Sequence, residues 1–222
     1  MQKRWFVRAA LTALLSLGLY AIAAPAAVAA PAAGAATVTR MSGETAMAGF
    51  EYKQGDKSVF VQVNAQPTGL MSPSGQPLSG PAVSVSITEC QGDASGSYAG
   101  AASAPGLRFT DLTRVALPAT SVKVFPVGDP ETPPPPGPPF FVTVALTWIG
   151  VGNITTNHVV DHVQISPTAK ETFVFHGRTR NATVAGSVAY TSPLFGSLTL
   201  TGANANFVQL NAGGVVVILI ER

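Results

Sequence analysis

Short runs of alternating hydrophobic and polar residues recur along the chain after residue 40, separated by segments rich in Gly, Pro, Asn and Ser. In the run KSVFVQVNAQ (57–66), valine occupies every second position from Val59 to Val63, which is the two-residue period of a β-strand. Helical periodicity is nearly absent. The pattern predicts an all-β fold of about ten to twelve short antiparallel strands, arranged as a β-sandwich or a jelly-roll-like domain.

Two of these runs give sharper local predictions. GETAMAGFEYK and KSVFVQVNAQ flank Gln54-Gly55-Asp56, which predicts a hairpin with its turn at these three residues. FFVTVALTWIG (140–150) is the most apolar strand, and its Trp148 is expected to be a large anchor of the core. The aromatic residues in or near predicted loops either form an exposed platform or are buried at loop tips; they are Tyr98, Tyr190 and Phe195.

A proline-rich segment, residues 129–139, interrupts the strands. Proline has no amide proton for a sheet ladder, so this segment is expected to be an exposed loop in the polyproline II conformation. We favour an excursion from a single β-sandwich domain spanning residues 41–222. The alternative is a hinge between two small β domains, 41–128 and 140–222, each of which would have a marginal core.

The N-terminus has the features of a secretory signal peptide. Three basic residues (Lys3, Arg4 and Arg8) precede an uncharged apolar run, and Ala27-Val28-Ala29 fits the small-x-small cleavage rule. We therefore expect residues 1–29 to be cleaved and residues 30–40 to form a flexible segment. The mature chain is expected to be secreted or periplasmic, without a membrane span, and the Ala-rich signal is typical of a bacterial exporter.

Removal of the signal changes the charge balance. The full chain has thirteen basic and eleven acidic residues, and the signal removes three basic ones, so the mature chain has ten against eleven, a net charge of −1. Nucleic-acid binding requires clustered positive charge, and we exclude this class of partner. Cys90 is the single cysteine, so no intrachain disulfide can form. We expect it to be a small, buried, apolar residue, and the alternative is a free thiol that pairs with another molecule.

The stretch NHVVDHVQI (157–165) carries two of the three histidines. In a strand, His158 and His162 would lie about 13 Å apart and could not share one metal ion. Folding this stretch back on ETFVFHGRTRN about the connection 167–170 instead predicts that His162 faces His176 and that His158 faces Arg180. Directly opposed residues are close enough to chelate, so His162 and His176 are the candidate metal ligands, although a third ligand is not evident.

The same hairpin allows two other interpretations. His158, Arg178 and Arg180 would form a binding patch for an anion or an acidic glycan. In the structural interpretation, which we favour, they belong to the polar outer face of a hairpin. Its inner face would then hold five apolar residues and, at a cost that this register does not explain, Asp161. The apolar residues are Val159, Val163, Ile165, Phe173 and Phe175.

Catalytic motifs are missing from the sequence. There is no Gly-x-Ser-x-Gly elbow, no Gly-rich phosphate loop and no zinc spacing of cysteines, and the acidic residues are scattered. The leading hypothesis is therefore a non-enzymatic exported module, without a cofactor, that binds an extracellular or cell-surface ligand or has a structural role. The alternative is a metal-assisted or glycoside hydrolase that uses the face of the 154–181 hairpin and takes a divalent metal.

Overall fold

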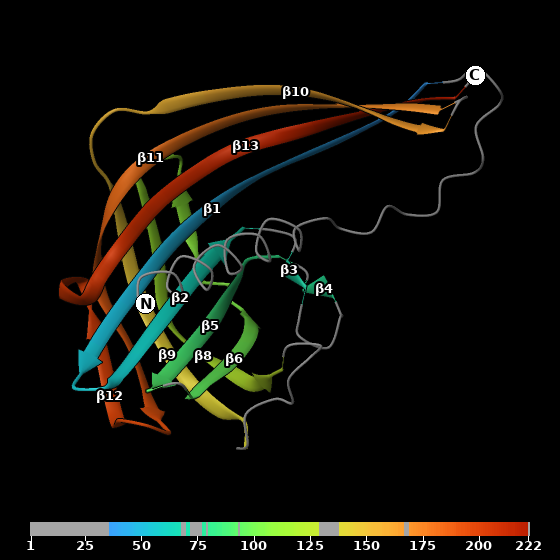
Figure 1. Ribbon diagram of the computed structural model, residues 1–222. Helices are drawn as coiled ribbons and strands as arrows, with labels where there is room; N and C mark the ends of the chain where they lie inside the picture. Colours follow the sequence, from blue (N-terminus) through green and yellow to red (C-terminus); the bar gives the residue numbers. More distant parts are fainter. Residues whose placement is uncertain are drawn as a thin grey trace.

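The computed structural model describes residues 36–67, 70–71, 77–78, 80–92, 94–128, 138–166 and 169–221 (Figure 1). The predicted signal peptide and residues 129–137 of the proline-rich segment lie outside them, while Pro138 and Pro139 are described and exposed. The first strand begins at Ala36, so residues 36–40, which we expected to precede the fold, form part of it.

The described chain consists of strands and one short 3-10 turn, and every pairing between named strands is antiparallel, so the all-β prediction is confirmed. The strands are β1 (Ala36–Gln54), β2 (Lys57–Gln66), β3 (Leu70–Met71), β4 (Pro77–Leu78), β5 (Ala82–Gln91), β6 (Ala94–Ser103), β7 (Arg108–Thr110), β8 (Arg114–Val127), β9 (Phe140–Gly150), β10 (Thr155–Ser166), β11 (Ala169–Ser192), β12 (Gly196–Thr201) and β13 (Ala205–Glu221), with the 3-10 turn at Gly202–Asn204. Among the described residues there is no helix long and apolar enough to cross a membrane.

Eleven of the strands form one sheet that folds back on itself (Figure 1). Its main path is β10-β11-β13-β1-β2-β5-β6-β8-β7. The long strand β11 pairs with β13 through residues 169–181 and with β9 through residues 182–190, and β9 pairs in turn with β8. The path therefore returns to β11 and forms two layers. One layer contains β13, β1, β2, β5 and β6, and the other contains β9, β7 and β12. β8 and β11 contribute to both layers, as strands do at the corners of folded sheets.

The core lies between the two layers. Alternate residues of β2 and β9 point into it, and Trp148 is fully buried, as the sequence predicted. Its indole Nε1 donates a hydrogen bond of 3.0 Å to the Met47 carbonyl oxygen of β1, across the core. Truncation of such a side chain to alanine typically costs about 3–5 kcal/mol.

The predicted hairpin between β1 and β2 is also confirmed. Gln54 pairs with Lys57, so the loop consists of Gly55 and Asp56. Gly55 has a φ of 64°, a left-handed conformation that glycine adopts without a steric penalty.

A buried carboxyl group forms the second link between the layers. Glu89 on β5 is 2% exposed, and it accepts a 3.2 Å hydrogen bond on Oε1 from the Tyr190 hydroxyl of β11. Oε2 has no hydrogen-bond partner in the described part of the chain. Phe140 packs between two tyrosines, with ring centroids 5.0 Å from Tyr98 and 5.7 Å from Tyr190. Tyr98 and Tyr190 are thus buried on strands β6 and β11, and they do not form an exposed platform.

This environment favours the neutral form of both phenols. Burial, and then the neighbouring Glu89 carboxyl, raise the pKa of Tyr190 far above its ordinary value near 10, and the same two causes raise the pKa of Tyr98. In the unfolded chain both phenols ionise near pH 10. The stability from neutral Tyr190 is therefore fully present below pH 10 and is lost as the pH rises above it.

We expect the free energy of unfolding to fall by up to about 1.4 kcal/mol per pH unit above pH 10 because of Tyr190 alone. Tyr190→Phe should be less stable at neutral pH, because Glu89 loses its hydrogen-bond donor, but it should show a shallower alkaline slope. Urea denaturation at a series of pH values, followed by phenolate absorbance, measures both effects. An identical slope in the wild type and the variant would contradict this assignment.

Candidate ligand-binding site

The inner face of the sheet continues beyond the core along β1, β13, β11 and β10. Ala46, Leu210 and Arg180 form one row across the strands, and the first two are buried core residues. Opposed residues, and every second residue along a strand, point to the same face. The next rows outward on that face are Glu44–Ala212–Arg178–Thr156 and Gly214–His176–His158.

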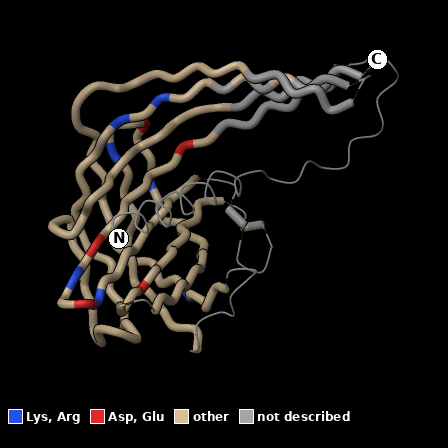
Figure 2. The backbone as a smooth tube through the Cα atoms, in the orientation of Figure 1, with Lys and Arg blue, Asp and Glu red and all other residues tan. Residues whose placement is uncertain are grey.

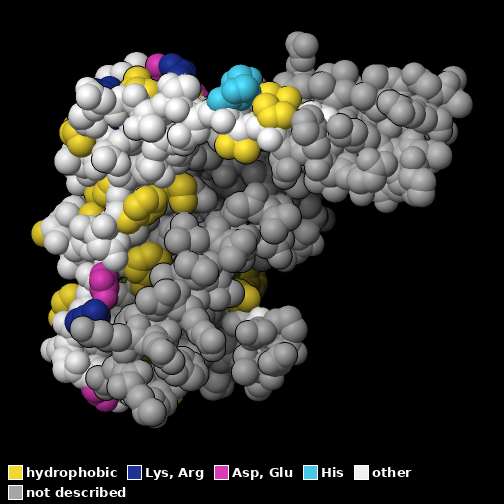
Figure 3. Space-filling view, turned by 45° about the horizontal axis from the view of Figure 1, so that its top comes forward, with side chains coloured by type: hydrophobic (Ala, Val, Ile, Leu, Met, Phe, Trp, Pro, Cys, Tyr) yellow, Lys and Arg dark blue, Asp and Glu magenta, His cyan; other side chains and the backbone are white. Residues whose placement is uncertain are grey.

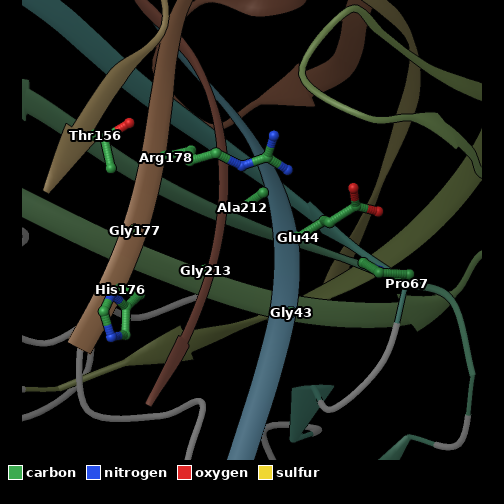
Figure 4. Close-up of a pocket in the computed structure, with 9 residues that line it drawn as sticks. All are labelled: Gly43, Glu44, Pro67, Thr156, His176, Gly177, Arg178, Ala212 and Gly213. Carbon is green, nitrogen blue, oxygen red and sulfur yellow. The ribbon is translucent and has the colours of Figure 1, made fainter. Parts of the chain in front are cut away.

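An open pocket of about 630 Å³ lies where this polar part of the face leaves the core (Figure 4). In Figure 4, the side chains of Arg178 and Glu44 extend from strands β11 and β1 into the same space near Ala212. The pocket is lined by Gly43, Glu44, Pro67, Thr156, His176, Gly177, Arg178, Ala212 and Gly213.

A row of glycines contributes backbone to the lining of the pocket. Gly43, Gly213 and Gly177 are directly opposite one another on β1, β13 and β11, and Asn157 of β10 completes the row. The backbones are tightly placed here, because a Cβ atom on Gly213 would lie 2.7 Å from the His176 carbonyl oxygen. A side chain at residue 213 would therefore force β13 away from β11.

The register of β10 against β11 differs from the prediction. His158 faces His176, and their rings stack with centroids 4.2 Å apart and an interplanar angle of 10°. His162 faces Thr172 and Arg178 faces Thr156, so the predicted pairs His162–His176 and His158–Arg180 were wrong. His162 and His176 are offset by four residues, or about 13 Å along the strand.

The turn and the neighbouring strand explain the difference. The connection spans only residues 167–168, because Ser166 pairs with Ala169 after a bulge, whereas we had assigned it to residues 167–170. β11 is also held from its other side by β13, with Gly177 opposite Gly213. Hairpin register depends on loop length and turn type, and neither is visible in the hydrophobic pattern.

The predicted orientation of this face is also corrected. His158, His176 and Arg178 were assigned to the outside of the hairpin, but they lie on the side of the sheet that continues the core. Val159, expected to be buried inside, is 55% exposed on the opposite face. Figure 3 shows histidine side chains at the surface, next to exposed hydrophobic ones.

The two predicted arginines connect this face to the turn between β7 and β8. Arg178 forms an ion pair of 2.9 Å with Asp111, whose backbone has a φ of 46°. Arg180 donates from Nε to the Gly152 carbonyl oxygen at 3.1 Å and from Nη1 to the Leu112 carbonyl oxygen at 3.3 Å. Arg180 is thus engaged in holding loops, whereas Arg178 also lines the pocket. Both groups of the Arg178–Asp111 pair are about half exposed, so the pair contributes less than about 1 kcal/mol.

Charged residues are few elsewhere, as Figure 2 shows. No group of three His, Cys, Asp or Glu side chains that could hold a metal ion occurs among the described residues. Burial raises the pKa of the Cys90 thiol, which opposes formation of a thiolate. The side chain of His162 lies outside the described set, so its role as a metal ligand stays a prediction.

Sequence reasoning missed the contribution of three other segments to the pocket. Glu44, Pro67 and Ala212 come from β1, the end of β2 and β13, and only the sheet order brings them to the histidine stretch. The glycine pair Gly213-Gly214, in the middle of an apolar strand, was the one available signal, since interior glycines often mark a close approach of backbones.

Comparison with known proteins adds no relative to this description. No family model matches the sequence, and no curated protein or solved structure matches it.

Proposed function

We propose that the chain is an exported, non-enzymatic binding module that holds a neutral, hydroxyl-rich ligand, such as a short glycan, in the inner-face pocket. The observation that carries the proposal is the composition of the pocket. A guanidinium donor (Arg178), a carboxylate acceptor (Glu44), an imidazole (His176) and a hydroxyl (Thr156) surround a floor of glycine backbone. Mixed donors and acceptors in one pocket suit a ring that carries several hydroxyl groups.

The charge balance favours a neutral ligand over the anion that the sequence suggested. Arg178 is already paired with Asp111, and Glu44 adds a second carboxylate to the same region. An anionic ligand would have to compete with Asp111 for Arg178 and would meet repulsion from Glu44.

The size and openness of the pocket support binding. Its volume of about 630 Å³ falls within the range of small-molecule sites, roughly 300–1,000 Å³. Arg178, the strongest donor in the pocket, is about half exposed, so a ligand can reach it directly from solvent.

We expect a panel of short neutral glycans to include a ligand that perturbs the NMR signals of residues lining the pocket. Arg178→Ala should weaken that ligand about tenfold or more, because hydrogen bonds to a charged group are worth roughly 1.5–3 kcal/mol. Arg114→Ala is the matched control, since Arg114 is exposed at the start of β8 and does not line the pocket. Isothermal titration calorimetry gives the affinities.

Two outcomes would contradict this proposal. Equal weakening by Arg178→Ala and Arg114→Ala would remove the pocket from the binding site. Release of hydrolysis products from the bound glycan would show that the protein is an enzyme and would restore the hydrolase alternative. Thermal melts of both variants establish that they are folded.

The export part of the proposal rests on residues 1–29 and has its own test. The full chain, expressed in a bacterial host with its own leader, should appear outside the cytoplasm with Ala30 at its N-terminus, as determined by mass spectrometry of the intact protein. Substitution of the apolar residue Leu15 by Arg should interrupt the hydrophobic run and retain the chain in the cell. Recovery of a cytoplasmic protein that still contains residues 2–29 would contradict the export proposal.

A further inference from the structure

β10 forms one margin of the sheet. It pairs with β11 along Thr155–Ser166, and no other strand pairs with it in the described part of the chain. In Figure 1, β10 runs along the outer margin of the sheet, beside β11. A free edge presents a row of unpaired backbone N–H and C=O groups, and these are a template for another strand.

This edge lacks the lysine and proline residues that often prevent such pairing. Thr155–Ser166 contains no lysine or proline, and its only charged residue is Asp161. Val159 is 55% exposed and Val160 is 48% exposed, and as neighbours in a strand they point to opposite faces. Three more exposed large apolar residues lie just before β10, at the end of β9 and in the following connection; they are Ile149, Val151 and Ile154.

We propose that β10 pairs in antiparallel orientation with β10 of a second copy of this chain, about a two-fold axis at Val159. A two-fold axis perpendicular to the sheet leaves the even-numbered side chains of both copies on the same face. Two opposed residues share a face, so their numbers must be both even or both odd. The regular part of the strand ends at the bulge after Gln164. With the axis at Val159, residues 155–163 of one copy pair with residues 163–155 of the second copy. This register uses nearly all of the regular part of the strand.

The second copy is favoured over an unrelated strand because this register is self-complementary. It places Val159 against Val159 of the second copy, so that an exposed apolar residue is covered by its own equivalent. It also sets Asn157 opposite Asp161 of the second copy, an amide opposite a carboxylate, and it does so twice because of the two-fold symmetry. Symmetric dimers with such isologous contacts are the commonest oligomers of soluble proteins.

The pairing would also bring two pockets together. Because the faces are continuous across the axis, the His158–His176 face of each copy lies on the same side of one larger sheet. A ligand with repeated units could then engage both pockets, which raises its apparent affinity by avidity. The dimer does not depend on the glycan proposal, and it is tested without ligand.

The first test is sedimentation of the mature chain (30–222) over a wide range of concentrations. We expect a reversible dimer for the wild type and a monomer for Val159→Lys, because lysines placed at the axis repel one another and oppose pairing. Val127→Lys is the matched control, an exposed valine (44%, against 55% for Val159) at the end of β8, and should remain dimeric. A wild-type protein that stays monomeric up to millimolar concentration, or a dimeric Val159→Lys, overturns the proposal.

A second measurement tests the register and does not rely on the lysine variant folding normally. In a Cys90→Ser background, Val159→Cys should form an intermolecular disulfide under mild oxidation, because Cα atoms of opposed residues lie within the range that a disulfide spans. Val127→Cys should form this bond much more slowly. Equal rates of crosslinking for the two variants would show that the contact is random and would refute the two-fold pairing. A β10 strand that pairs only with extended peptides of other proteins would also give equal rates.

Discussion

The pairing of β11 with β13 along one half and with β9 along the other is the constraint on which the rest of the structure depends. Its first half, residues 169–181, is held by β13, and its second half, residues 182–190, by β9. These two ladders connect the layers and set the position of the inner face. A shift of β11 by one residue would exchange its inward and outward side chains along the whole strand.

Four interactions between distant parts of the chain reinforce this arrangement. The Trp148 indole donates to β1 from within the core, and Tyr190 of β11 donates to the buried Glu89 of β5. At the end of the core, Arg178 and Arg180 reach the turn between β7 and β8. The two arginines thus connect the core to the polar part of the inner face, and one of them is available to a ligand.

The hydrophobic pattern was sufficient to predict the class of the fold and several local features. The alternation of valines in β2, the turn at Gly55 and the burial of Trp148 are each decided by residues close together in the sequence. The candidate site was predicted only in part. His158, His176 and Arg178 do share one face, but their partners depend on a two-residue connection and on the contact of Gly177 with Gly213. Glu44 and Pro67 join them through sheet order, which alternation along a single strand does not encode.

The central structural claim is the register of β10 against β11, which places Thr156 opposite Arg178 and His158 opposite His176 on the inner face. Its most direct test uses two double-cysteine variants in a Cys90→Ser background, oxidised at low protein concentration and mapped by peptide mass spectrometry. His158→Cys with His176→Cys should form an intramolecular disulfide, because these residues are directly opposed. His162→Cys with His176→Cys should not, since an offset of four residues places the two Cα atoms about 13 Å apart along the strand. The reverse result would show that the hairpin adopts a different register and that Thr156 and His158 do not lie beside Arg178 and His176.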